Sequence, residues 1–235
     1  MRAYPVTHVG LVREQNEDTV CANVAQGVYI LADGMGGHLA GEVASSMTTD
    51  ELEKRLSACR EPSTEILREA IAQTNAIVYE KQMSDPSMKG MGTTLTVLWE
   101  DKAHVHIGHV GDSRAYLMRD GKMRQMTEDH SMVGELLRAG VITPEKARTH
   151  PQRNVITQAV GADISVQPDV FTIIKNPGDK WLLCSDGLTD MVEDTAIAQV
   201  IDQYDSESAV QKLLQLALDN GGKDNISIML LEVEA

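Results

Sequence analysis

Aromatic residues and positive charge are both scarce in this sequence of 235 residues. One Phe, two Trp and five Tyr make up 3% of it, whereas hydrophobic residues as a whole make up 42%. We therefore expect a packed core built from Val, Ile, Leu, Ala and Met. The 21 Lys and Arg are outnumbered by 35 Asp and Glu, which leaves a formal net charge of −14. This balance disfavours a nucleic-acid binder, which needs a basic face, and docking to an anionic membrane surface.

Cysteines and long apolar runs are few as well. The N-terminal segment lacks the apolar stretch of a secretory signal, and no apolar run approaches the length of a membrane span. Cys21, Cys59 and Cys184 form no Cys-x-x-Cys pair and predict neither a disulfide framework nor a zinc site. We expect them to be small buried residues in a reducing cytoplasm. No repeat or linker divides residues 1–235, so we expect one domain, with a monomer as the default.

Short runs rich in β-branched residues alternate with helical patterns. Strands are predicted at 19–24, 27–32, 93–99, 103–110, 170–174, 180–184 and 225–233, and the dipeptide Asp120-Gly121 predicts a type I′ turn between two more. Helices are predicted at 41–56, from Ser63 or Thr64 onward, at 196–201 and at 209–218. This order is not a regular βαβ alternation, so antiparallel sheets covered by helices are favoured over a parallel sheet. The least regular stretch is 127–165, which predicts a surface flap at about 129–165 with a short helix near 132–139.

Aspartate stands beside glycine at the end of one apolar strand after another. The cases are Asp33-Gly34, Gly111-Asp112 and Asp186-Gly187, with Gly222-Lys223-Asp224 and Asn16-Glu17-Asp18 placed just before other strands. One such aspartate is ordinary in a turn, but stacked sheets would bring all of these carboxylates to one edge. Clustered carboxylates repel each other and need cations to stay ionised. Oxygen ligands suit Mg²⁺ or Mn²⁺, and two adjacent ions would activate water for displacement at phosphorus.

A set of six motifs carries a family resemblance. They are Arg13-x-x-Asn16-Glu17-Asp18, Ala32-Asp33-Gly34-Met35-Gly36-Gly37-His38, Gly92-Thr93-Thr94, Gly108-x-x-Gly111-Asp112-Ser113-Arg114, Ser185-Asp186-Gly187 and Gly222-Lys223-Asp224-Asn225. This set resembles the metal-dependent Ser/Thr protein phosphatases of the type 2C (PPM) family, above all their compact bacterial catalytic domains. The resemblance implies an α+β fold: two packed antiparallel β-sheets flanked by antiparallel helices on both faces, an α-β-β-α sandwich.

The resemblance also implies a metal site for two Mn²⁺ or Mg²⁺ ions, with a third ion in bacterial members. Asp33 looks like the carboxylate that bridges the two ions, and the carbonyl of Gly34 looks like a further ligand. The remaining implied ligands are Asp186 and Asp224 at the first ion, Glu17 and Asp18 through water, and Asp112 with Asp186 at the third ion. Six acids of the chain thus belong to this implied site, so part of the chain's negative charge would serve to hold metal ions.

The implied reaction is hydrolysis of phosphoserine and phosphothreonine in proteins by direct in-line attack of a water activated by both metals, without a phosphoenzyme. Arg13 resembles the residue that grips the phosphate, and Asn225 resembles a support for the loop around Asp224. Eukaryotic relatives carry His directly after Asp-Gly, where Met35 stands here. His38 is therefore a candidate general acid, and a metal-bound water is the alternative. A cognate bacterial Ser/Thr kinase and its targets are the expected partners.

Three other enzymatic or metal-binding functions and one binding function fit these residues less well. A serine esterase would use Ser113 as nucleophile, yet no histidine base follows His150. An aspartyl-phosphate enzyme based on Asp186 would need an early Asp-x-Asp, which is absent. His104 and His106 share a strand face, which more often covers a sheet than binds a transition metal. A phosphoprotein-binding regulatory module on the same fold would be expected to lack Arg13 or a metal aspartate, and all are present.

Overall fold

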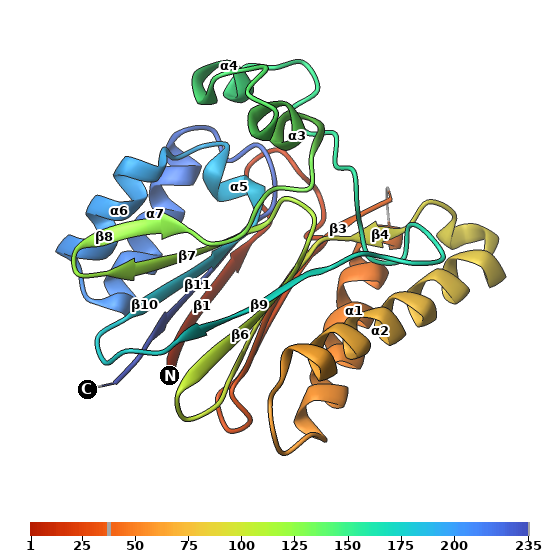
Figure 1. Ribbon diagram of the computed structural model, residues 1–235. Coiled ribbons are helices and arrows are strands. Elements are labelled where there is room, and N and C mark those ends of the chain that lie inside the picture. The colour runs from red at the N-terminus through yellow and green to blue at the C-terminus, as the bar shows by residue number, and fades with distance from the viewer. Residues whose placement is uncertain (37–38, 235) are drawn as a thin grey trace.

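Two antiparallel sheets form the centre of the computed structural model, which describes residues 1–36 and 39–234 (Figure 1). The first sheet has the order β1 (Arg2–His8), β11 (Ile226–Glu232), β10 (Lys180–Cys184), β7 (Arg114–Arg119), β8 (Lys122–Gln125). The second has the order β2 (Asp18–Asn23), β3 (Val28–Met35), β5 (Leu95–Glu100), β6 (His104–Val110), β9 (Asp169–Ile174), and β4 (Gly92–Thr93) pairs with β3. The predicted α+β sandwich of antiparallel sheets is confirmed.

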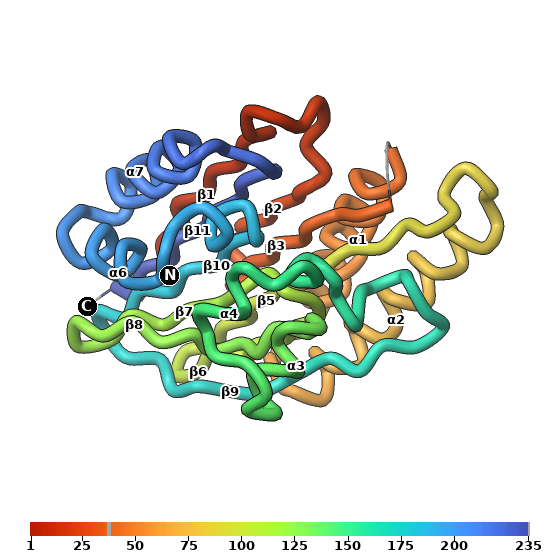
Figure 2. Tube along the Cα trace, turned by 90° about the horizontal axis from the view of Figure 1, so that it is seen from above, coloured from red at the N-terminus to blue at the C-terminus, as the bar shows by residue number. Residues whose placement is uncertain are grey.

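Helices cover the outer face of each sheet. Helices α1 (Leu39–Ser57) and α2 (Thr64–Ser84) pack on the second sheet, and α6 (Asp194–Gln203) and α7 (Ser206–Asp219) pack on the first (Figures 1 and 2). Of the two predicted caps, Ser63 and Thr64, it is Ser63 that caps α2 by accepting a hydrogen bond from the backbone N–H of Ile66. The short elements η1 (Pro86–Met88), α3 (Met132–Arg138), α4 (Pro144–Arg148) and α5 (Asp186–Thr189) complete the described helices.

The core has three apolar layers, one between the sheets and one under each pair of helices. The few aromatic residues are concentrated there, because Trp99, Trp181, Tyr29 and Tyr116 are among the largest fully buried side chains. The prediction that the cysteines are buried is correct only for Cys184. Cys21 and Cys59 are half-buried beside α1. No helix within residues 1–36 and 39–234 combines the length and the apolar character needed to cross a membrane.

The local sequence correctly predicts the hairpin turn at 120–121 but does not predict the first strand. Asp120 has φ 52° and Gly121 has φ 70°, as a type I′ turn requires, and the turn joins β7 to β8. No strand was predicted before residue 19, yet residues 2–8 form β1. Pro5 lowers the strand signal, but β1 is an edge strand that pairs only with β11, where a missing N–H can face away from the sheet.

The strand ends near Asp33, Gly111 and Ser185 come to the same edge of the sandwich, together with the start of β11. Helices α3 and α4 stand above this edge, whereas Arg2 and Glu232 pair at the opposite edge (Figure 1). The predicted short helix near 132–139 is confirmed as α3.

Candidate metal centre

A cavity of about 300 Å³ opens at this edge and gathers most of the predicted site residues. Its lining includes Arg13, Glu17, Asp33, Gly34, Asp112, Asp186, Asp224 and Asn225. Asp18 is buried and lies opposite Asp33 in the β2–β3 register. His38 lies outside the described residues. Residues far apart in the sequence are therefore brought together in the way that the strand-end aspartates suggested.

The glycines of the motifs allow the segments of the site to approach closely. A Cβ atom on Gly34 would lie 2.1 Å from the carbonyl oxygen of Gly41 and 2.6 Å from that of Glu17. A Cβ atom on Gly187 would lie 1.9 Å from the carbonyl oxygen of Asn225. Any side chain at either position would push a backbone segment away from the carboxylates.

Hydroxyl groups of β4 and its neighbour hold the backbone of Asp33. Its N–H donates to Thr94 Oγ1 at 3.0 Å, and its carbonyl oxygen accepts from Thr93 Oγ1 at 2.9 Å and from Thr94 N–H at 2.9 Å. Thr94 Oγ1 in turn lies 2.7 Å from Ser113 Oγ, one residue after Asp112. The Gly-Thr-Thr motif therefore has a structural role that the sequence reading did not assign: it fixes Asp33 relative to Asp112.

Asn225 fastens the loop that carries Arg13. Its side-chain Nδ2 donates to the carbonyl oxygens of Val9 at 2.9 Å and Gln15 at 2.8 Å, and its Oδ1 accepts from Glu17 N–H at 2.8 Å. Its own backbone N–H donates to Asp224 Oδ1 at 2.9 Å. Asn225 thus supports both the loop before β2 and the carboxylate next to it, which extends the predicted role.

Desolvation and neighbouring carboxylates make four acids at this cavity unfavourable as anions. The pKa of Asp33 lies well above its usual range, because its half-buried carboxyl is desolvated and because other carboxylates, Asp18 first among them, surround it. The pKa of Asp186 is raised well above its usual range for the same two reasons, with Asp112 as its strongest carboxylate neighbour. A group of acids in this state favours the entry of cations.

The two remaining shifted acids differ in their neighbours. Burial raises the pKa of Asp18 to about 6, although hydrogen bonds from Ser227 and Ser185 lower it; Ser185 Oγ donates to Asp18 Oδ2 at 2.9 Å. Burial and Asp129 raise the pKa of Asp112 to about 7, although Arg114 lowers it.

The donor set fits hard divalent cations. Every predicted ligand atom is a carboxylate or carbonyl oxygen, as Mg²⁺ and Mn²⁺ prefer. Asp18 Oδ1 is buried without a hydrogen-bond partner, which is costly unless a cation or its water satisfies it. No three His, Cys, Asp or Glu side chains of the described part of the chain are arranged so that they could hold an ion as they stand. Asp224 is engaged in an ion pair instead.

That ion pair joins Asp224 to Arg13. Arg13 Nη2 lies 2.7 Å from Asp224 Oδ2, and the arginine side chain is 54% exposed. The hydrogen bond with Asp224 raises the pKa of Arg13, so its guanidinium stays charged. The arginine is therefore at the mouth of the cavity, cationic and free on its outer side.

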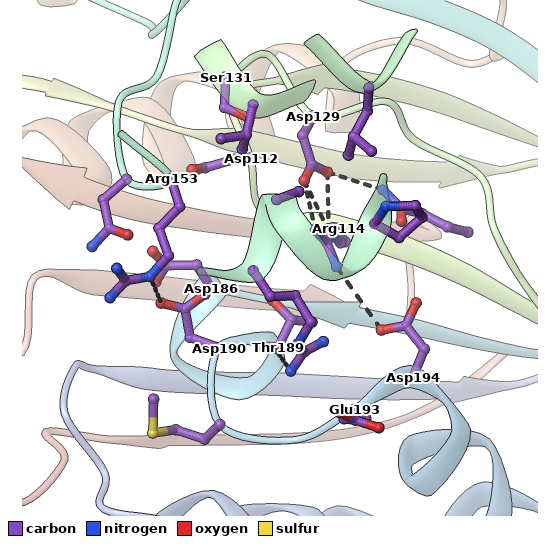
Figure 3. A pocket seen from close by; sticks show the side chains of 18 of the residues that line it. Asp112, Arg114, Asp129, Ser131, Arg153, Asp186, Thr189, Asp190, Glu193 and Asp194 are labelled. Atoms are coloured by element: carbon purple, nitrogen blue, oxygen red, sulfur yellow. Dashed lines mark hydrogen bonds and ion pairs between the residues drawn. The ribbon is translucent and has the colours of Figure 1, made fainter. Parts of the chain in front are cut away.

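A second cavity of about 720 Å³ adjoins the first beneath α3 and α4. The two share Asp112, Asp186 and Asn154 in their linings. Figure 3 shows Arg114 between Asp129 and Asp194, and Arg153 reaching Asp190. The sequence reading missed Asn154 and Arg153, because they belong to the irregular flap and carry no motif.

Two alternative sites are not formed among the described residues. Ser113 is buried with its hydroxyl against Thr94, and no described histidine is hydrogen-bonded to that hydroxyl, so a serine-esterase site is absent there. His104 Nδ1 and His106 Nε2 lie 3.3 and 3.5 Å from Asp101 Oδ2. His106 Nδ1 also lies 2.9 Å from Thr172 Oγ1, so this pair belongs to a polar network on the sheet.

Comparison with known proteins agrees with this geometry. A profile of the family "Protein phosphatase 2C" matches residues 12–230. The serine/threonine protein phosphatase PstP of Mycobacterium tuberculosis is 39% identical over 227 residues, which cover 95% of this chain and 43% of PstP. This chain thus spans less than half the length of PstP. The serine/threonine phosphatase stp of Listeria welshimeri is 40% identical over 235 residues, covering 96% of this chain and 93% of stp. A crystal structure of the PstP catalytic domain with two manganese ions superposes with a TM-score of 0.91 at 35% identity, covering 100% of this chain and 98% of that one.

Proposed function

The chain belongs to the protein phosphatase 2C family, and from that premise we propose that it is an active enzyme that hydrolyses phosphoserine and phosphothreonine in proteins. The observation that carries the proposal is the cavity of desolvated, mutually repelling carboxylates with the Arg13 guanidinium at its mouth. We propose residues 1–235 as one catalytic domain, a cytoplasmic monomer whose substrates are the targets of a cognate bacterial Ser/Thr kinase.

Proteins of this family depend on metal, and here we propose two Mn²⁺ or Mg²⁺ ions, with a third as an option. Asp33, Asp186, Asp224 and the carbonyl of Gly34 would hold the core ions, Glu17 and Asp18 would hold their water, and Asp112 would serve the third. The chemistry supplied by divalent ions, when bound, is activation of water and neutralisation of phosphate charge.

Arg13 would bind the phosphate by replacing its ion pair with Asp224 by an ion pair with the phosphate. Its planar fork now meets a single Asp224 oxygen, and its exposed side offers further N–H groups to phosphate oxygens. An incoming phosphate would compete with Asp224 for the guanidinium and release that carboxylate for a cation. Substrate binding and metal ligation by Asp224 would then support each other.

The lining of the first cavity disfavours a covalent intermediate on a hydroxyl side chain. Its only described hydroxyl side chain is Thr94, which is engaged with Ser113 and the Asp33 backbone. A serine or threonine nucleophile is therefore disfavoured, and we propose that the attacking oxygen comes from water, in line with the departing seryl or threonyl oxygen. We retain His38 as the proposed donor of the proton that this oxygen takes up.

The experiment is release of phosphate from p-nitrophenyl phosphate and from a phosphothreonine peptide, with Mn²⁺, with Mg²⁺ and after chelation. We expect release from both substrates with metal, none after chelation, and loss of release in Asp224→Asn. The matched control is Asp202→Asn, which removes an exposed acid from α6 and should keep the parent rate. Absence of release while Mn²⁺ is bound would contradict the proposal and favour a phosphoprotein-binding module.

A further inference from the structure

His130 lies at the base of the flap and is bonded to the turn that carries Asp112. Its backbone N–H donates to the carbonyl oxygen of Gly111 at 2.7 Å, and Gly111 N–H donates back to His130 Nδ1 at 3.2 Å. These two reciprocal hydrogen bonds connect His130, a residue of the flap, to Gly111, the residue directly before Asp112. Nothing in the proposed reaction uses His130 itself.

The ring of His130 is held at both nitrogen atoms. Nε2 lies 3.1 Å from Asp169 Oδ2, at the start of β9, where the chain returns from the flap to the sheet. Because Nδ1 accepts from a backbone N–H, the proton must be on Nε2, which donates to the carboxylate. The ring also packs against that of His109, with centroids 5.0 Å apart, and is buried. Its tautomer and orientation are therefore both fixed.

The turn that this ring holds is a demanding one. Gly111 has φ 103°, and a Cβ atom there would lie 2.7 Å from Thr94. The returning flap segment adds a further tie, because Thr157 N–H donates to the carbonyl oxygen of His130 at 2.7 Å. His130 thus connects the outgoing flap, the returning flap, β9 and the Asp112 turn.

We propose that His130 is a positioning residue: its Nδ1, by accepting from Gly111 N–H, fixes the Asp112 turn for phosphate hydrolysis. This inference rests on the proposed function of the neighbouring carboxylates. It predicts that the residue acts on the chemistry of any phosphate ester, rather than only on protein substrates that touch the flap.

Two substitutions separate the roles of the two ring nitrogens. In His130→Asn, the amide oxygen takes the place of Nδ1 and can still accept from Gly111 N–H, while the bond to Asp169 is lost. In His130→Gln, the amide N–H takes the place of Nε2 and can still reach Asp169, while the acceptor for Gly111 is lost. The measurements are hydrogen exchange of the Gly111 amide by NMR in metal-free protein, and kcat and KM for p-nitrophenyl phosphate and a phosphothreonine peptide with Mn²⁺.

We expect His130→Gln to exchange the Gly111 amide about 10-fold faster and to lower kcat about 10-fold on both substrates with little change in KM. His130→Asn should stay within about threefold of the parent in both measurements. The matched control is Ser131→Ala, which removes the α3 cap accepting from Gly134 N–H and should leave Gly111 exchange unchanged.

Equal effects of the Asn and Gln substitutions would overturn the inference, and so would a loss confined to the peptide substrate. If His130→Gln does not fold, faster Gly111 exchange in His130→Asn is by itself enough to overturn it. The hydrogen-exchange measurement does not depend on activity. An inactive parent protein would therefore contradict the proposed function, while exchange of the Gly111 amide would still test whether His130 fixes the turn.

Discussion

Two desolvated carboxylates at opposite ends of one sheet have their pKa values shifted in opposite directions. At the end away from the cavity, burial alone would raise the pKa of Glu100, but hydrogen bonds from Lys175, the Met1 ammonium and Tyr29 lower it. At the cavity end, burial also raises the pKa of Asp33, and the surrounding carboxylates raise it further. The two groups lie on adjacent strands, β5 and β3, of the same sheet.

The contrast separates stability from function. A buried acid that is placed only for stability is given positive or donating partners, as Glu100 is. Asp33 is surrounded by other carboxylates instead. This arrangement destabilises the folded state until cations bind. The difference between these ends is stronger evidence for a cation site than the number of acids in the chain.

The largest expected effect is that of Asp33→Asn. With Mn²⁺, its kcat should fall on the order of a thousandfold, because a ligand at the centre of the site is lost. In chelator, the same change should raise the free energy of unfolding by about 2 kcal/mol, because a neutral amide replaces a carboxyl whose ionisation is opposed by desolvation and by neighbouring acids. Urea unfolding and phosphate release measure the two outcomes. A variant that loses both stability and activity would break the contrast between the two ends.

A pH series on Asp112→Asn comes next in size. The folded pKa of Asp112 is about 7, above its value in the unfolded chain, so the carboxyl contributes stability at low pH that is lost as pH rises through about 7. In chelator, the free energy of unfolding of the variant should equal that of the parent at about pH 4. At about pH 8 it should be higher than that of the parent by on the order of 3 kcal/mol.

Comparing variant with parent in that series cancels the buried His109, whose lowered pKa of about 4 acts in the opposite direction. Urea unfolding at each pH gives the difference. A stability gain that does not depend on pH would show that Asp112 is not held protonated in the metal-free protein.

At the opposite end, Lys175→Met should lower the free energy of unfolding by about 2 kcal/mol. Its ammonium donates to Glu100 Oε2 and to the carbonyl oxygen of Asp101, and the substitution leaves that buried carboxylate short of a partner. Phosphate release should keep the parent kcat, because the lysine is far from the cavity along the strand. A fall in kcat larger than about threefold would show that the two ends are not independent.

The smallest expected effect is that of Tyr29→Phe, about 1 kcal/mol of unfolding free energy. The hydroxyl donates to Glu100 Oε1 at 2.7 Å, and two other donors remain on that carboxylate. Thermal unfolding in chelator and in Mn²⁺ should show the same loss, since the metal acts at the other end. Unequal losses would indicate coupling along the sheet.

Signals carried by the local sequence predicted much of the fold. The Asp120-Gly121 turn and the Ser63 cap follow from backbone preferences that neighbouring residues decide. Strand β1 was missed because Pro5 obscures it, and only the edge position beside β11 makes that proline acceptable.

For the candidate site, the motifs predicted which residues meet but not how they bond. The pairing of Arg13 with Asp224 and the bonds of Asn225 to the loop at 9–17 depend on contacts between segments about 200 residues apart. His130 carried no signal, because its role depends on one ring nitrogen facing the N–H of Gly111. Such contacts are set by packing, which a periodic pattern does not encode.

The most direct test of the cation site is a calorimetric titration of Mn²⁺ into the metal-free parent protein, Asp33→Asn and Lys175→Met. The parent and Lys175→Met should bind at least two ions per chain, and Asp33→Asn should lose at least one. The same uptake by the parent and Asp33→Asn, or no uptake by the parent, would contradict the assignment of the repelling carboxylates as the metal centre.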